Sequence, residues 1–384
     1  MAFHVLRCPR LLEGRRCART AGTRRPAGAV LLSCLAVALS GCERVRPVVI
    51  GVSTSPPFVQ AARMAVDDEL VAGGVPGLDT VMMPESRSLA APAIETARRL
   101  VAVAGMTAVV GHSNSAASLA AAPIYNDHEV VQITPTASAP AFSRAGRFSF
   151  RLVPYDDRQG RFLAEYVGEA LPDGGRLAVV YVNDDYGRGL RAALLASLDA
   201  ERFPVVVELP HVENDLRDAD AAYAAGALRA ARPDVVLWLA RGGTLAGFLP
   251  SIRAVLPDVP IVGGDAVEAG GLQAAPRELW GDIRSVAYVD LDATEALRSF
   301  TRRFRDRFGR DPTGPDALTY DAVRLVIAGL RAGARTGPEL RAYLMTLGRA
   351  SPPYAGLTGP IVFDDAGDVE RSYVLETMGR ARPP

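Results

Sequence analysis

The sequence predicts an α/β protein made of two units, each built on a doubly wound parallel sheet. Two observations support this prediction. Apolar runs of strand length alternate with helical segments from residue 48 to residue 263, and strands that alternate with helices form parallel sheets. The chain has 384 residues, of which 49% are hydrophobic, so about two domains with sizeable cores are expected.

The first 41 residues are predicted to be a signal peptide of the lipoprotein type. Seven Arg and one Glu come before an apolar run at 27–39, which is too short to span a bilayer. The run ends in Leu39-Ser40-Gly41-Cys42, which resembles a bacterial lipobox, whose Cys is lipidated and becomes the new N-terminus. Residues 42–47 would then form a lipid-anchored tether. An ordinary signal peptide with an incidental Cys is the alternative.

Composition excludes several classes of function. Removing those seven Arg and one Glu from 43 basic and 43 acidic residues leaves a net charge of −6, which argues against binding to nucleic acid or to a membrane surface by charge. Cys42 would be the only remaining Cys, so no intramolecular disulfide is expected. The sequence has no HExxH, CxxC or Walker spacing, and no metal or cofactor is expected.

The first unit is organised around residues 107–140, where a polar turn follows each of two apolar runs. A helix connecting the runs would make them parallel neighbours, so both turns would emerge at the carboxyl edge of one sheet. Ligands of open α/β sheets bind at that edge. The expected strands are 48–52, 78–83, 107–110 and 130–133, the expected helices are 60–70, 92–104 and 115–125, and residues 148–152 lead out of the unit.

These two turns predict half of a binding site. Ser115 stands at a helix start, where free backbone N–H groups and the helix dipole favour an anion such as a carboxylate. The second turn offers the carbonyl of Ala137 beside the hydroxyl of Ser138, an acceptor next to a donor. Together the turns could hold a small zwitterion.

The Gly-His turn at 111–112, the Ser-rich helix start and the Pro-x-Ala-Ser turn at 135–138 resemble the periplasmic leucine/isoleucine/valine-binding proteins, the solute receptors of ABC importers. This resemblance implies a type I periplasmic-binding fold with two lobes and a three-strand hinge. The expected lobes are residues 48–152 plus 285–350 and residues 153–284 plus 351–384. It also implies a monomeric, non-enzymatic receptor at the cell envelope that delivers an amino acid or similar small polar solute to an ABC permease and ATPase.

The second unit continues the alternation. Its expected helices are 159–171, 187–198, 216–231 and 244–256, and its expected strands are 177–182, 205–209, 235–239 and 261–263. By resemblance, residues 285–289 cross back to the first lobe and helices 294–308 and 315–332 complete it. Residues 354–369 resemble the family's closing hairpin, expected in the second lobe with its turn at Asp365 to Asp368.

Three residues of the second unit are predicted to complete the site. In the resembled family a Tyr corresponding to Tyr186 packs on the ligand. Asp265 is predicted to accept the ligand's ammonium group, since such a group needs a carboxylate partner when it leaves water; a helix N-cap is the alternative. Arg241 departs from the aromatic residues of the branched-chain type, and would meet an anionic ligand group or offset Asp184. Phe58 is either a side wall of the pocket or a core residue.

The sequence leaves three alternatives to a transport receptor: a hydrolase, a dinucleotide-binding enzyme and a protein of the same fold without a role in transport. Gly111 to Ser115 resembles part of a G-x-S-x-G nucleophile elbow, but Ser115 stands where Gly is required, and His112, His128 and His211 have no acid at a characteristic spacing. Residues 187–192 fit G-x-G-x-x-A with Glu208 as the ribose acid, although four residues separate the strand from the first glycine. A ligand sensor or envelope-assembly partner of the same fold is the remaining alternative, and the ligand itself is left open.

Overall fold

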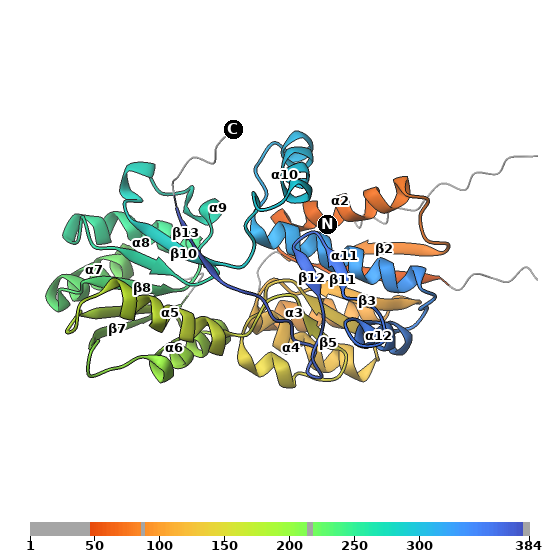
Figure 1. Cartoon of the computed structure of the whole chain (residues 1–384), viewed down its shortest axis with the longest axis horizontal. Coiled ribbons are helices and arrows are strands. Elements are labelled where there is room, and N and C mark those ends of the chain that lie inside the picture. Colours follow the sequence, from red (N-terminus) through yellow and green to blue (C-terminus); the bar gives the residue numbers. More distant parts are fainter. Residues whose placement is uncertain (1–46, 86–88, 213–217, 379–384) are drawn as a thin grey trace, which may run out of the picture.

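The computed structural model describes residues 47–85, 89–212 and 218–378, so the predicted signal peptide and Cys42 lie outside the described residues. Two lobes of sheet and helices lie side by side (Figure 1), which confirms the predicted fold class. In the described part of the chain, no helix is both long enough and apolar enough to cross a membrane.

The sheet of the first lobe is parallel, with the strand order β2-β1-β3-β4-β5. Its inner strands read as continuous apolar runs because helices cover both faces. Val110 and Ile50 pack in the core on one face, whereas Val109 packs against α3 and α4 on the other. The strands are β1 Val48–Ser53, β2 Leu78–Met82, β3 Met106–Gly111, β4 Val131–Thr134 and β5 Ser149–Arg151. The helices are α2 Pro56–Val71, α3 Ala90–Val101, α4 Ser115–Asp127, η1 Pro140–Arg144, α10 Glu295–Phe308, α11 Gly314–Arg331 and α12 Gly337–Thr346.

The sheet of the second lobe has the order β13-β10-β9-β8-β6-β7. It differs from the expected all-parallel sheet because β13, at one edge, runs antiparallel to β10. The strands are β6 Leu177–Val182, β7 Val205–His211, β8 Val235–Leu239, β9 Ile261–Gly263, β10 Ile283–Ala287 and β13 Val374–Thr377. The helices are α5 Asp156–Ala170, α6 Asp185–Ser197, α7 Asp218–Ala231, α8 Gly242–Val255, α9 Ala269–Leu272 and η2 Arg277–Leu279.

The hairpin near the C-terminus belongs to the first lobe, and the prediction that placed it in the second was wrong. Its strands are β11 Tyr354–Gly356 and β12 Gly359–Ile361, and Ile361 and Phe363 pack in the first core. The Asp321 carboxylate on α11 accepts the N–H groups of Leu357 (2.7 Å) and Thr358 (2.8 Å), which fixes the turn there and not at 365–368. The crossing back also comes later than residue 285, because all of β10 lies in the second sheet.

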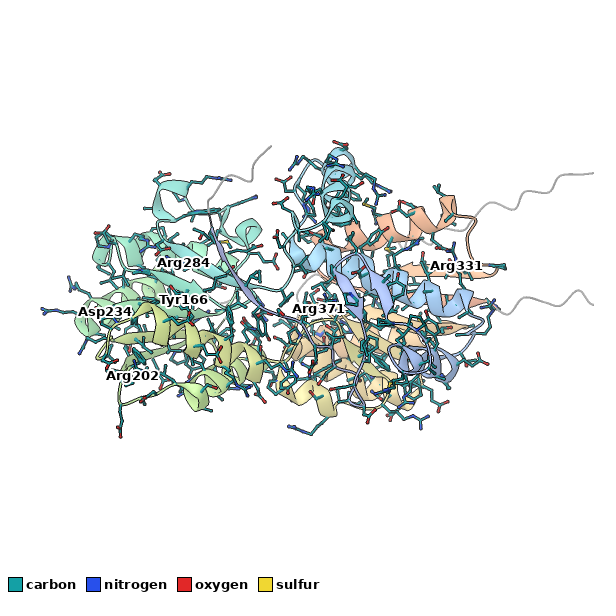
Figure 2. The ribbon with its side chains drawn as sticks, viewed as in Figure 1. Tyr166, Arg202, Asp234, Arg284, Arg331 and Arg371 are labelled. Carbon is teal, nitrogen blue, oxygen red and sulfur yellow. The ribbon has the colours of Figure 1, made fainter. Side chains whose placement is uncertain are left out.

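The chain passes between the lobes three times, at about 152–155, 288–290 and 369–373, as the neighbouring residues pass from one core to the other. Arg371, labelled in Figure 2, ties two of these segments together. Its Nε donates to the carbonyl of Leu152 (2.7 Å) and its Nη1 to the carbonyl of Thr358 (2.7 Å). Three neighbouring connections between two lobes form a hinge.

Candidate ligand-binding cleft

A cavity of about 390 Å³ lies between the lobes, where the carboxyl ends of the inner strands of both sheets meet. In each sheet the strand order reverses at this point, between β1 and β3 and between β6 and β8, which is where α/β sheets bind ligands. The wall is formed by Ser55, Pro56, Phe58, Glu85, Ser113, Asn114, Ser115, Thr136, Pro315, Tyr186, Arg241, Gly242, Gly243, Asp265, Ala266, Glu268, Gly271 and Tyr288.

The first-lobe wall presents the start of α4, as predicted for Ser115. Asn114 is the N-cap, and its Oδ1 accepts the N–H of Ala117 at 2.8 Å. Ser115 begins the helix, and its Oγ accepts the N–H of Ala139 at 3.1 Å. The other N–H groups of the first turn and the helix dipole favour a negatively charged group at this wall.

Ala137 and Ser138 do not reach the wall where the sequence analysis placed them. Both are almost completely buried, and Thr136 lines the cavity in their place. The carbonyl of Ala137 faces the guanidinium of Arg151 (Nη1 at 3.4 Å), and the carbonyl of Ser138 accepts the N–H of Asp156 at 2.9 Å. The turn therefore uses these carbonyls to hold the hinge.

Asp265 stands at the second-lobe wall, just beyond the end of β9. Its Oδ1 accepts the hydroxyl of Tyr186 (2.8 Å) and its Oδ2 accepts the hydroxyl of Tyr288 (3.1 Å). Its own N–H donates to Gln159 Oε1 at 2.9 Å. Glu268 is the N-cap of α9, so the interpretation of Asp265 as a helix cap is wrong. A Cβ at Gly264 would lie 2.6 Å from the Tyr186 hydroxyl, so glycine makes this contact possible.

Burial and neighbouring charges set the protonation states of the two tyrosines and of the buried aspartates around them. Burial, and then the charge of Asp265, raise the pKa of Tyr186 and of Tyr288 far above 10, so both hydroxyls keep the protons that they donate. Burial also raises the pKa of Asp265, and raises that of Asp156 strongly, with the charge of Asp265 adding to it. Since Asp156 is completely buried and Asp265 borders the cleft, we infer that Asp156 holds the proton and that Asp265 presents the negative charge.

Arg241 lines the cleft and offsets Asp184, which was one of its two expected roles. Its Nη2 donates to Asp184 Oδ2 at 3.1 Å, with both side chains half-buried. Asp184 caps α6 by accepting the N–H groups of Tyr186 and Gly187, each at 3.0 Å. The ion pair joins the loops that follow β6 and β8, and so fixes the edge of the cleft beside Tyr186.

Replacing Arg241 by Ala should lower the free energy of unfolding by about 1 kcal/mol, since partly exposed ion pairs contribute little more than that. It should also change ligand preference, because Asp184 then adds an uncompensated negative charge beside the cleft. Urea unfolding and calorimetric titration with amino acids of different charge would measure the two effects. Unchanged affinities across that series would contradict a role for Arg241 in selection.

Glu85, Glu268 and Tyr288 line the cleft but were not among the predicted site residues. Tyr288 stands on the second crossing segment, Glu268 lies three residues after Asp265 in the same loop, and Glu85 follows β2. Phe58 also lines the cleft, in agreement with the side-wall interpretation. An acid three residues beyond the end of β2 was the available signal for Glu85, whereas Glu268, five residues beyond the end of β9, gave no such signal.

The geometry does not support the hydrolase alternative, although the fold gives one histidine an acid partner that no characteristic spacing indicated. His112 does have an acid partner, because its Nδ1 lies 2.7 Å from Glu85 Oε1. The imidazole is completely buried, and its Nε2 pairs with the hydroxyl of Tyr125 at 3.1 Å. A general base must reach the nucleophile's proton, and both nitrogens of this ring are directed to other groups.

The glycines of the proposed dinucleotide motif are not in the position that such a motif requires. Gly187 and Gly189 lie inside α6, which begins at Asp185, and not in the turn that leaves the strand. A Cβ at Gly187 would lie 2.0 Å from the carbonyl oxygen of Val182, so this glycine serves close packing of helix on strand. Glu208, the expected ribose acid, pairs with Arg191.

His211 lies at the end of β7 and makes the stability of the protein depend on pH. Burial, and then the charge of Arg241, lower its pKa to about 4, although Asp184 acts in the opposite sense. In the unfolded chain the pKa of His is about 6.5. Unfolding therefore takes up a proton below that value, so the stability that neutral His211 provides is complete above pH 6.5 and is lost as the pH falls toward 4.

The variant His211→Phe should lose less stability than the wild type between pH 7 and pH 4.5. Phe retains a ring against Trp238 and Phe248, whose centroids lie 5.6 and 5.4 Å from that of His211. Urea unfolding at the two pH values measures the difference, and His128→Gln, at an exposed position, is the control. Equal losses in His211→Phe and the wild type would refute this assignment.

Comparison with known proteins agrees with the fold and the position of the cleft. The sequence profile of the family described as periplasmic binding protein matches residues 50–376. The chain belongs to this family. A relative from Pseudomonas aeruginosa, the leucine-, isoleucine-, valine-, threonine-, and alanine-binding protein, is 26% identical over 325 residues, which are 80% of this chain and 81% of the relative.

Two solved structures resemble this periplasmic binding protein closely in fold. An ABC transporter substrate-binding protein from Desulfitobacterium hafniense, in complex with Leu, has a TM-score of 0.69 and 25% identity over 86% of this chain and 97% of that one. LivJ from Streptococcus pneumoniae, in complex with isoleucine, has a TM-score of 0.76 and 22% identity, and the match covers 87% of this chain and 96% of LivJ. The family implies an exported protein that works outside the cytoplasm.

Proposed function

We propose that this protein is the extracytoplasmic substrate-binding component of an ABC importer and that it binds an amino acid or a similar small polar solute. The main observation is the cleft itself. It places the Asp265 carboxylate, held by two tyrosine hydroxyls, in the same cavity as the start of α4. An ammonium group and a carboxylate of one small molecule would match these two features.

Each half of the ligand head would be bound by one lobe. The carboxylate would accept N–H groups of the first turn of α4 and the Ser115 hydroxyl. The ammonium would donate to Asp265, whose two oxygens have lone pairs beyond those used by Tyr186 and Tyr288. Because the two charges lie on different lobes, a zwitterion gains both sets of bonds only when the lobes approach each other.

Closure about the hinge therefore provides the mechanism. A ligand stabilises the closed form only through its higher affinity for that form. The three crossing segments allow the lobes to rotate, and Arg371 links two of those segments so that they would move together. The closed form would be the one presented to the permease. A receptor of this kind has no chemical step, so we infer that it is not an enzyme.

A thermal-shift screen tests the proposal directly. The purified protein is incubated with amino acids, amides and small organic acids, and the unfolding temperature is measured. A ligand at a hundredfold excess over Kd adds about 2.7 kcal/mol to the free energy of unfolding, which is a shift of several degrees. The proposal expects shifts from compounds with an ammonium and a carboxylate group. If organic acids without an ammonium group shift the protein and amino acids do not, the assignment of Asp265 fails.

We also propose that Cys42 is lipidated and anchors the protein at the cell envelope. The supporting observation is the Leu39-Ser40-Gly41-Cys42 sequence after an apolar run. Two or more acyl chains are enough for stable attachment. Cys42→Ala should move the protein from the membrane fraction to the soluble fraction of the envelope, and retention in the membrane fraction would contradict lipidation.

A further inference from the structure

The cleft contains more acidic than basic side chains. Among the described residues that line it, Glu85, Asp265 and Glu268 are acidic and Arg241 is the one basic residue, already paired with Asp184. Asp265 suffices for one ammonium group. The two glutamates therefore indicate a second positive charge in the ligand.

Glu268 enters the cavity from the same loop as Asp265, with Ala266 and Val267 between them. Burial raises the pKa of its carboxyl to about 8, and the charges of Asp316 and Asp265 contribute to this rise. The basic residue nearby is Arg310 on the first lobe, but its guanidinium is bound to both oxygens of Asp316, at 2.7 and 2.9 Å. Arg310 and a hydrogen bond with Thr313 offset this rise only in part. The Glu268 carboxyl therefore keeps its proton at pH 7 when the cleft is empty, and a cationic ligand group would stabilise its charged form.

Glu85 lies on the wall of the opposite lobe. Its Oε1 lies 2.7 Å from His112 Nδ1 and accepts the N–H of Ser113 at 3.3 Å. These contacts hold the carboxylate beside the start of α4, next to where the ligand's own carboxylate would lie. The cavity therefore has acidic groups on both lobes.

The cavity also has room for a long side chain. Gly243 lines it, and a Cβ added there would meet no atom within 4 Å. Ser55 and Thr136 add polar groups to the wall. An unbranched polar chain fits this lining better than the branched apolar side chain of leucine, which would desolvate the Glu268 carboxyl group without offering it a cation.

We propose that the ligand is an amino acid with a second cationic group, a diamino or guanidino acid, whose distal cation is bound by Glu268 and attracted by Glu85. This inference rests on the proposed function, because it assumes that the α-ammonium group is bound at Asp265. Glu268 is then the residue that determines specificity, and Asp265 the residue that recognises amino acids in general.

Calorimetric titration with pairs of amino acids of equal length tests the inference. The pairs are ornithine and norleucine, lysine and 2-aminoheptanoic acid, and arginine and citrulline, which have side chains of equal length and differ mainly in the charge of the distal group. At least one cationic member should bind the wild type 10-fold or more tightly than its neutral partner. Glu268→Gln should remove that preference and leave the affinity for the neutral partner within about 3-fold. Glu278→Gln, an exposed acid in the same lobe, should change neither affinity.

The outcomes separate this inference from the proposed function. If neutral members bind as tightly as cationic ones, the inference is overturned, although the receptor function stands. If no amino acid of either kind binds, both fail. The comparison on the wild type decides the question even where Glu268→Gln does not fold, and a Glu268→Gln protein that folds and retains the full preference would assign the selectivity to other residues.

Discussion

The variant Asp265→Asn should bind its amino-acid ligand about 10 to 150 times more weakly than the wild type. A hydrogen bond to a charged group contributes about 1.5 to 3 kcal/mol, and each 1.4 kcal/mol is a factor of ten in Kd. Asn has nearly the same shape, so Tyr186 can still donate to the side-chain oxygen while the negative charge is lost. Calorimetric titration with the best ligand of the thermal-shift screen measures the change.

Two controls make the Asp265 result specific. Asp258→Asn removes an exposed acid of the same lobe and should leave Kd within experimental error. The unfolding temperature of Asp265→Asn without ligand should not fall, because the burial that raises the pKa of Asp265 disfavours its charged form. An Asp265→Asn protein that binds as tightly as the wild type would show that the ammonium group is bound elsewhere.

Local sequence patterns predicted most of the fold because its strands are short, buried and apolar. The bounds of β6, β8 and β9 agree with the predicted ones. Helix α12 was missed, although Thr336 caps it by accepting the N–H of Glu339 and Pro338 stands in its first turn, a recognisable start signal. The lobe of the hairpin at 354–361 was predicted wrongly because Asp321, which holds its turn, is more than 30 residues away.

The difference between local patterns and contacts far apart in the sequence also explains which site residues were predicted correctly. Ser115, Tyr186, Arg241 and Asp265 lie two to four residues beyond the end of a strand, and such positions reach the carboxyl edge whatever the tertiary details are. Ala137 and Ser138 also follow a strand, but the Arg151 guanidinium turns the carbonyl of Ala137 away from the cleft. The partnership of Glu85 with His112 joins residues 27 positions apart, and no spacing rule covers such a pair.

The largest loss of stability is expected from breaking the ion pair between Arg151 and Asp368. Arg151 is completely buried at the end of β5, and its Nε donates to Asp368 Oδ1 at 2.6 Å. Its Nη1 also donates to the carbonyl of Ala139 at 3.0 Å. Asp368→Ala leaves a buried guanidinium without a countercharge, which costs about 3 to 5 kcal/mol. Urea unfolding measures the loss, and Asp365→Ala, which breaks the exposed pair with Arg349, should cost about 1 kcal/mol or less.

The double variant Arg151→Met, Asp368→Leu tests whether the pair stabilises the fold or specifies its arrangement. Apolar residues can replace a buried ion pair with little loss or even a gain in stability, so the double variant should be more stable than Asp368→Ala. Asp368 precedes the third crossing segment, and Arg151 precedes the first. If the double variant regains stability but its ligand-induced thermal shift is reduced, the pair sets the geometry of the hinge. If it is no more stable than the single variant, the hydrogen bonds of Arg151 to the turn at 137–139 are the main contribution.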